Sequence, residues 1–275
     1  MFSDRFTLKK LTFCFIIYFL FSFCSYASNT NVLEKNCYYN FDYQSTIQNC
    51  TNLIKINNNN SKAYFSRGRA NLLVNNYPSA IIDFTQAINL NPNYIAAYSL
   101  RANAKNNLKD FRGAIIDYTQ AIGLNPKEAN FYWNRGDSKL GLDDFRGALE
   151  DFQQVLALDP NRFLVLKDIG YAKYRLKEYS NAIEIFDIVI SYLQNEIAKP
   201  LIFSNPNLDE ETKQALIAMD SSFKNIDKEN LAEALFFRGL CKIILQFKDE
   251  GCIDLSTAGQ LGYTKAYQII KESCD

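Results

Sequence analysis

A period of 34 residues runs through the middle of this chain and limits the folds that it can adopt. Segments that begin at Ser61, Ile95 and Ala129 align without gaps, and a weaker copy begins at Phe163. Each copy holds two stretches of about a dozen residues with apolar side chains at helical spacing. A hairpin of two such helices keeps an apolar face exposed until a neighbouring hairpin packs on it. The period therefore predicts an all-α solenoid of stacked antiparallel helix pairs.

Small, aromatic and proline residues recur in phase within this period. The small residues allow the two helices of a unit to approach closely, and the aromatic residue fills the remaining space. An Asn-Pro or Asp-Pro step ends the second helix, because proline disfavours a helical residue before it. The recurring sets are Gly68, Ala102 and Gly136; Ala80, Ala114 and Ala148; Phe84, Tyr118 and Phe152; and Pro92, Pro126 and Pro160.

These segments resemble the tetratricopeptide repeat family. The resemblance is carried by AYFSRGRANLLVNNYPSAIIDFTQAINLNP, AYSLRANAKNNLKDFRGAIIDYTQAIGLNP and FYWNRGDSKLGLDDFRGALEDFQQVLALDP, and it covers residues 61–196. It implies a right-handed superhelix of helix pairs with a concave inner face that holds a protein or peptide. The expected units are 61–94, 95–128, 129–162 and 163–196.

The flanks of this array keep parts of the pattern. A degenerate repeat is expected in residues 28–60, where the stretch 43–54 parallels 77–88. The phase returns at Ala232, so residues 232–275 are expected to form a final unit and a capping helix at 264–273. The stretch between, 197–231, contains two X-Pro steps and is either an insertion with a helix at 209–222 or an eroded repeat.

The first 27 residues have the order of a secretory signal. A basic start at Arg5, Lys9 and Lys10 precedes an apolar stretch and the small residues of Ser25-Tyr26-Ala27. This order predicts export with cleavage after Ala27, and hence a periplasmic, envelope-associated or secreted protein. A retained membrane anchor is the alternative, although the stretch is shorter than the roughly 20 residues that span a bilayer. Lipid attachment at Cys24 is disfavoured by the bulky Phe23.

Composition excludes several classes of function. The chain has no histidine, and its 30 basic and 30 acidic side chains balance. Histidine is the commonest general base and metal ligand, and no C-x-x-C pair offers a cysteine zinc site. A neutral chain has no net attraction to nucleic acid. We expect no enzyme, metal, cofactor or nucleic acid, and membrane contact only through the signal segment before cleavage.

Arginine and aspartate recur together at the seventh and twenty-third positions of the units. Antiparallel helices bring these positions level, so each pair is expected to form an ion pair across its hairpin. The unit from Phe163 has Ile169 and Ile185 at both places. A row of ligand-binding arginines is the alternative, which the matched aspartates disfavour. The pairs are Arg67 with Asp83, Arg101 with Asp117, Arg135 with Asp151, and Arg238 with Asp254.

The helical turn of about 100° per residue places positions two, five, nine and twelve of the first helices on the inner side, with position six at its edge. Amides there suit a peptide backbone, and Trp133 and Phe65 suit apolar side chains. The competing interpretation is that these are ordinary surface residues whose aromatic rings contact the next repeat. The expected binding residues are Phe65, Arg69, Ser99, Asn103, Asn106, Asn130, Trp133, Asn134 and Asp137. Phe65 and Asn134 stand where the chaperone-binding members carry basic residues, which argues against capture of a C-terminal carboxylate.

Five cysteines remain after cleavage of the signal, in a compartment where disulfides persist. The segment RGLCKIILQFKDEGCIDLSTAGQLGYTKAYQIIKESC resembles the closing module of bacterial envelope proteins of this family, which implies a bond between Cys252 and Cys274. Helix positions leave Cys241 with Cys252 as a rival. They also allow Cys37 to pair with Cys50 in the first hairpin.

The sequence thus favours an exported, non-enzymatic scaffold that binds a protein or peptide in the inner groove. The alternative is a permanent structural subunit of an envelope assembly that uses the convex face or the 197–231 stretch.

Overall fold

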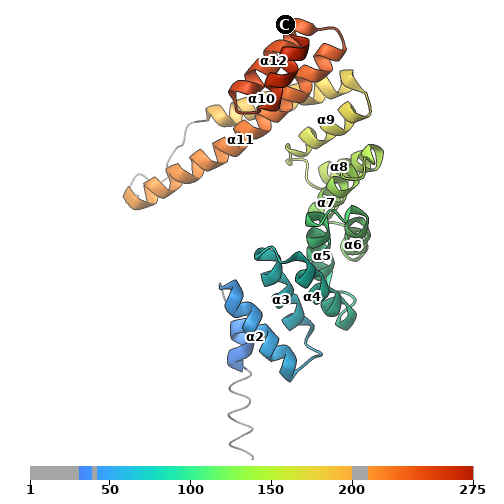
Figure 1. The fold of residues 1–275 in the computed structure, drawn as a ribbon, viewed down its shortest axis with the longest axis vertical. Helices are drawn as coiled ribbons and strands as arrows, with labels where there is room; N and C mark the ends of the chain where they lie inside the picture. Colours follow the sequence, from blue (N-terminus) through green and yellow to red (C-terminus); the bar gives the residue numbers. More distant parts are fainter. Residues whose placement is uncertain (1–30, 39–41, 200–209, 275) are drawn as a thin grey trace, which may run out of the picture. The chain divides into compact units, whose positions relative to one another are not determined.

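The structure, a computed structural model, describes residues 31–38, 42–199 and 210–274, and every regular element within them is a helix (Figure 1). The predicted signal segment and residues 200–209 lie outside the described residues. No helix in the described part is long and apolar enough to cross a membrane. Residues 31–38 are helical, followed by α2 (Tyr43–Ile56), α3 (Ser61–Leu73), α4 (Tyr77–Leu90), α5 (Ile95–Asn107), α6 (Phe111–Leu124), α7 (Ala129–Leu140), α8 (Phe145–Leu158), α9 (Val165–Arg175), α10 (Tyr179–Ala198), α11 (Glu210–Ile244), α12 (Lys248–Gln260) and α13 (Lys265–Ser273).

The chain divides into two compact units, residues 1–126 and 127–275. The described part of the first unit contains the hairpins α3/α4 and α5/α6, with α2 packed on α3. The second unit contains α7/α8, α9/α10 and α11/α12, with α13 packed on α12. Within each unit successive helices pack on one another, which confirms the predicted solenoid of helix pairs.

The two helices of each hairpin are joined by the same turn. Its next-to-last residue has positive φ, and the residue after it precedes the second helix. In three hairpins that following side chain caps the helix, as when Asp110 and Asp144 accept the backbone N–H of Gly113 and Gly147 at 3.0 Å. An N-cap acceptor satisfies one of the free N–H groups of a helix start. The positive-φ residues are Asn75, Lys109, Asp143, Lys177 and Gln246, with φ between 58° and 71°.

The small residues of the period lie where the helices meet. A Cβ added at Gly68 would come within 2.9 Å of the ring of Phe84. In the last hairpin two glycines face each other, and a Cβ added at Gly251 would stand 2.7 Å from the carbonyl oxygen of Gly239. The backbones of α11 and α12 therefore touch there, and any side chain would push the two helices apart.

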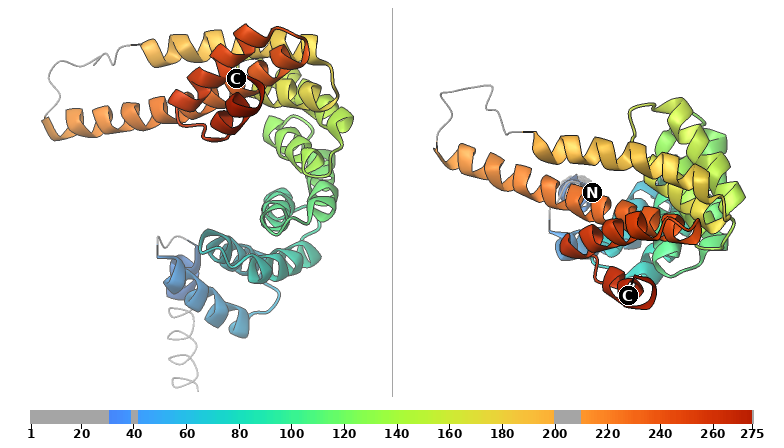
Figure 2. Two further views of the ribbon diagram at one scale, coloured as in Figure 1. Left: turned by 45° about the horizontal axis from the view of Figure 1, so that its top comes forward. Right: turned by 90° about the horizontal axis from the view of Figure 1, so that it is seen from above.

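Helices α10 and α11 are the two longest of the helices given above, and they pack on one another and run side by side in both views of Figure 2. The sequence predicted a short helix at 209–222 and a separate unit from Ala232. The structure instead has one helix, α11, from Glu210 to Ile244. No proline or glycine occurs in residues 223–231, so nothing ends the helix before the final unit begins.

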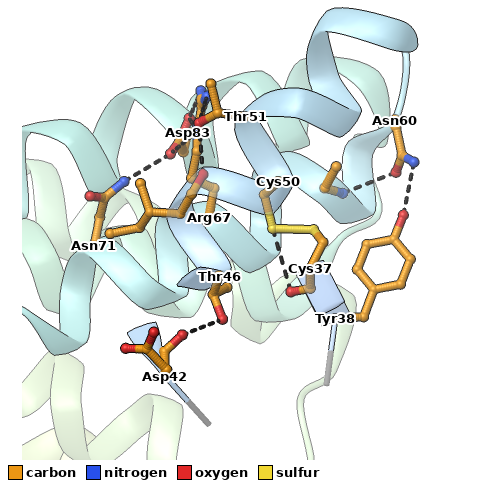
Figure 3. The surroundings of a disulfide bond; sticks show 12 residues. Cys37, Tyr38, Asp42, Thr46, Cys50, Thr51, Asn60, Arg67, Asn71 and Asp83 are labelled. Atoms are coloured by element: carbon orange, nitrogen blue, oxygen red, sulfur yellow. Dashed lines mark hydrogen bonds and ion pairs between the residues drawn. A yellow bond between two sulfur atoms is a disulfide. The ribbon is translucent and has the colours of Figure 1, made fainter. Parts of the chain in front are cut away.

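Two disulfides join neighbouring helices. Cys37 is bonded to Cys50 on α2 (Figure 3), and Cys252 on α12 is bonded to Cys274 after α13. Cys241, on α11, is buried and keeps a free thiol. Burial raises the pKa of this thiol to about 12. The structure therefore contains the Cys252–Cys274 bond that the resemblance implied and not its rival with Cys241.

Candidate functional site

The four expected arginine–aspartate pairs bridge their hairpins in the structure. In each pair the arginine Nη2 lies 2.6 Å from the aspartate Oδ1, and the arginine Nε also donates to the same carboxylate. Each aspartate side chain is at most 6% exposed, against 15–21% for the arginines. These guanidinium groups are therefore held inside the fold, and a partner does not meet a row of free arginines.

A third residue joins each pair, four positions after the arginine. Lys105 Nζ lies 2.7 Å from Asp117, and Lys139 Nζ lies 2.8 Å from Asp151. Lys242 takes the same place beside Asp254 at 3.2 Å, while Asn71 donates a hydrogen bond to Asp83. Sequence reasoning missed this residue, although lysine recurs there in phase and one turn of helix separates it from the arginine.

The arginines also reach the preceding hairpin through Nη1. Arg67 donates to Thr51 at 3.1 Å (Figure 3), and Arg101 donates to Thr85 at 3.0 Å. Arg238 makes the equivalent contact with Asp187 of α10 at 2.6 Å. Since Asp187 stands where the threonines stand in the period, α11/α12 stacks on α9/α10 as the next repeat. The described residues of 197–231 belong to extensions of α10 and α11.

Two of the predicted inner residues of the first unit, Phe65 and Asn103, are engaged in contacts within the fold. The ring of Phe65 stacks on Tyr94 with centroids 4.6 Å apart, and Tyr94 immediately precedes the next repeat's first helix. Asn103 accepts a hydrogen bond from the hydroxyl of Tyr118. Ser99 and Asn106 are half-buried. Arg69 is exposed, and no carboxylate in the described part of the chain lies within ion-pair distance of it.

In the second unit, Trp133 connects two repeats. Its Nε1 donates a 2.9 Å hydrogen bond to Oδ2 of Asp168, on α9. The guanidinium of Arg162 lies 5.2 Å from the centre of its ring, and Arg162 also donates to Asn130 at 2.7 Å. Trp133 thus contacts the next repeat, as the competing interpretation predicted, whereas Phe65 stacks on the last residue of its own unit. Trp133 nevertheless keeps 38% of its surface exposed.

Two carboxylates beside this tryptophan have raised pKa values. Burial raises the pKa of Asp168 to about 6; the Trp133 hydrogen bond and Lys167 oppose the shift, and the charges of Asp137 and Glu233 add to it. Burial among neighbouring groups also raises the pKa of Asp137, although its side chain still reaches solvent. Neither carboxylate forms an ion pair with any described residue.

Sequence reasoning missed most of this site because it counted inner positions in only three units. The same count in the unit from Phe163 gives Lys167, Asp168 and Tyr171, and in the last unit it gives Glu233. Arg162 lies in a loop, where helical spacing offers no signal. Of the predicted residues, Asn130, Trp133 and Asp137 gather here with Asn134 half-buried on the same helix.

No group of three or more histidine, cysteine, aspartate or glutamate side chains able to hold a metal occurs among the residues that the structure describes. What the side chains beside Trp133 can do is donate, accept and hold charge against another molecule.

Comparisons with known proteins agree with the repeat pattern. Sequence models of the tetratricopeptide repeat match residues 61–94, 95–128 and 134–192. No curated protein matches the chain in sequence.

Several solved structures share the fold. One titled MamA protein has 17% identity and a TM-score of 0.59, covering 65% of this chain and 100% of its own. YrrB, titled a TPR protein with an unusual peptide-binding site, has 15% identity and a TM-score of 0.58, with coverages of 81% and 97%. A tetratricopeptide repeat protein from Parabacteroides merdae has 18% identity and a TM-score of 0.58, with coverages of 90% and 100%. At such identities the likeness shows the fold alone.

Proposed function

We propose, on the premise that this chain belongs to the tetratricopeptide repeat family, that it is a non-catalytic scaffold that holds a protein or peptide partner. The partner would lie against inner positions of the first helices, in particular those around Trp133. Repeat arrays of this kind present extended surfaces for partners rather than catalytic sites. YrrB, which shares the fold, is titled as having a peptide-binding site, and this supports a peptide or protein as the partner.

The observation that carries the proposal is a contrast between two sets of charges. In the four arginine–aspartate pairs that bridge the hairpins, each buried aspartate is bound by an arginine and by a lysine or an amide. The inner carboxylates of Asp137 and Asp168 form no ion pair with a described residue, although burial raises the pKa of both. Leaving the desolvated Asp168 unpaired costs free energy, which a fold without a use for it would avoid, while Asp137 adds an exposed negative charge beside it.

We place the protein outside the cytoplasm. The signal-like order of residues 1–27 supports export. Two disulfides in a chain of this size support an oxidising compartment.

A permanent structural role is the second candidate, and one surface favours it. The N-terminal half of α11 exposes large apolar side chains on consecutive turns, which in an assembly would be covered. They are Ile217, Met219, Phe223 and Ile226, each between 41% and 60% exposed.

Affinity capture from the native cell envelope, followed by binding measurements with the purified partner, separates the two candidates. We expect Asp137→Arg to weaken capture at least about tenfold, because it changes charge and bulk on the inner side. Glu150→Arg, on the second helix α8 of the same repeat, is the matched control and should bind normally. If Asp137→Arg binds normally while Phe223→Ser on α11 abolishes capture, the inner surface is not the binding surface.

A further inference from the structure

The carboxylate of Asp168 is desolvated but has no cationic partner among the described residues. Its hydrogen-bond donor in the described part of the chain is the neutral indole N–H of Trp133, at 2.9 Å. The cation nearest in sequence, Lys167, is engaged elsewhere, because its Nζ lies 2.6 Å from Glu233 and 2.9 Å from Asn230 on α11. The negative charge of Asp168 is therefore not balanced by an ion pair with any residue that the structure describes.

The other elements around Asp168 add negative charge. From α7 comes Asp137, which reaches solvent and has no ion-pair partner among the described residues. From α11 comes Glu233, which forms an ion pair with Lys167. These side chains do not converge to hold a metal ion. Their charge suits instead an organic cation that reaches between two helices, such as the end of a long basic side chain.

A second, independent feature of the site is a buried donor without an acceptor. Arg162 uses Nη2 for Asn130 and places its guanidinium over the ring of Trp133. Its Nη1 is buried and has no hydrogen-bond partner, and it is the one such side-chain atom among the described residues. Native proteins seldom leave a buried donor unpaired. The Arg162 side chain is 26% exposed and its Nε lies 3.8 Å from Asp159, so a rotation of the guanidinium on binding would bring Nη1 to an acceptor of the partner, such as a peptide carbonyl.

We infer that Asp137 and Asp168, arranged around Trp133, recognise a lysine or arginine side chain of the partner, while Arg162 receives a main-chain carbonyl beside it. This inference rests on the proposed function and names the chemistry of its partner at one point. The exposed edge of the tryptophan ring would cover the aliphatic stem of the basic side chain. Charge complementarity selects the occupant, because neither carboxylate forms an ion pair with a described residue. The two nearby cations have other acidic partners: Lys167 is paired with Glu233, and Arg162 lies 3.8 Å from Asp159.

Trp133 gives a direct readout, since it is the only tryptophan in the chain. The probes are capped heptapeptides with one central arginine or lysine between glycines and serines, and the same peptide with central norleucine or glutamate. We expect the arginine and lysine peptides to change the Trp133 fluorescence saturably. The norleucine peptide should bind about tenfold more weakly or not at all, because its stem carries no charge.

Charge-neutral variants test the two carboxylates. Asp168→Asn keeps an acceptor for the indole N–H and removes only the charge, so affinity for the arginine peptide should fall about fivefold to tenfold. Asp137→Asn should have a smaller effect, because this side chain is better hydrated. Glu150→Gln, which removes an exposed carboxylate from α8, is the matched control and should leave binding unchanged.

The pH dependence distinguishes charge recognition from a structural effect. Since the pKa of Asp168 is raised to about 6, arginine-peptide binding should weaken as the pH falls through that value. The arginine itself does not titrate in this range. The Asp168→Asn protein should lose this pH dependence while remaining folded by circular dichroism.

Several results would overturn the inference. Equal binding of the norleucine and arginine peptides, or full binding by the double variant Asp137→Asn/Asp168→Asn, excludes recognition of a basic side chain. Saturable quenching by Ca²⁺ alone, lost in the same variants, would make this a metal site instead. If the captured partner depends on Asp137→Arg but is indifferent to Asp168→Asn and to pH, the inference fails and the proposed function stands.

Discussion

The hairpins α7/α8 and α9/α10 are neighbouring copies of one unit. Their seam, meaning the contact between positions seven and twenty-three of the two helices, is charged in the first hairpin and apolar in the second. In α7/α8 the buried Asp151 is held by Arg135 at 2.6 Å and by Lys139 at 2.8 Å. In α9/α10 the equivalent positions of the pair carry Ile169 and Ile185, which join the apolar cluster between α8 and α9. The two helices meet in both cases, so the hairpin itself does not require the ion pair.

The difference extends to the residues around the pair. Lys173, which corresponds to Lys139, turns to Glu178 at 2.9 Å because no aspartate faces it. The residue sixteen positions before the arginine is threonine in three of the charged units, namely Thr51, Thr85 and Thr119, and here it is Gln153. Arg67 and Arg101 donate hydrogen bonds to the first two of these threonines. The seam is thus either wholly charged or wholly apolar, as expected if a single unpaired charge costs more than the complete pair contributes.

The largest expected effect comes from breaking the charged seam by one residue. Asp151→Ile leaves Arg135 and Lys139 without their carboxylate, and we expect a loss of about 3–4 kcal/mol in the free energy of unfolding. The double variant Arg135→Ile/Asp151→Ile, which copies α9/α10, should lie within about 1 kcal/mol of the natural protein. Lys139 can then turn to Asp144, as Lys173 turns to Glu178.

Urea unfolding followed by Trp133 fluorescence measures this locally, because the tryptophan lies on α7. Circular dichroism reports the whole array, which need not unfold as one unit. A double variant that is as unstable as the single one would show that the ion pair itself, and not charge balance, holds the hairpin.

The reverse experiment sharpens the comparison. Ile169→Arg places an arginine in the apolar seam, and we expect a loss of about 2–3 kcal/mol because the new charge has no carboxylate. Adding Ile185→Asp should restore part of that loss, while the threonine contact of other repeats stays missing. Thermal unfolding of the single and the double variant, measured beside the natural protein, tests this. If Ile185→Asp adds a further loss of stability to that of Ile169→Arg, the two new residues do not form an ion pair.

The smallest expected effect has the opposite sign. The folded protein raises the pKa of Asp168 from 3.8 to about 6, so the folded state holds this proton more tightly than the unfolded chain. Its stabilising contribution is complete below about pH 4 and is lost as the pH rises through about 6. Asp168→Asn should therefore stabilise the protein by about 1–2 kcal/mol at pH 7.5, after allowance for solvent screening, and by less at pH 4.5.

Chemical denaturation of the Asp168→Asn protein at the two pH values provides the test. Glu150→Gln serves again as the control and should show no such pH-dependent gain. Destabilisation of Asp168→Asn at neutral pH would mean that the charge of Asp168 is already balanced within the fold.

Much of this architecture follows from the period alone. Antiparallel helices bring positions seven and twenty-three level, and the structure puts Arg67 and Asp83 2.6 Å apart. The continuity of α11 did not follow from the period, because the phase marks where a repeat begins, whereas continuity depends on the absence of helix breakers before Ala232. Counting inner positions along the period would have identified Asp168 as a site residue. It could not have shown that Asp168 lacks an ion pair with the described residues, because that depends on the contact of Lys167 with Glu233 in the folded structure.

The sequence alone also left the disulfide connectivity undecided. Cys241 and Cys274 both stood as candidates for Cys252, because helix positions alone made the former nearly level with it. The structure bonds Cys252 to Cys274 and Cys37 to Cys50. Level helix positions therefore predicted the Cys37–Cys50 bond of the first hairpin correctly. In the last hairpin they favoured Cys241 with Cys252, a bond that the structure does not contain.

The buried thiol of Cys241 bears on how the protein matures. Disulfide exchange begins with attack by a thiolate, and with a pKa of about 12 this sulfur is almost entirely protonated at neutral pH. Its complete burial also keeps glutathione and oxidoreductases away from it. In the folded protein, Cys241 therefore cannot exchange with the Cys37–Cys50 or the Cys252–Cys274 disulfide. The packing that buries its thiol also preserves the pairing of the four cysteines in these two bonds.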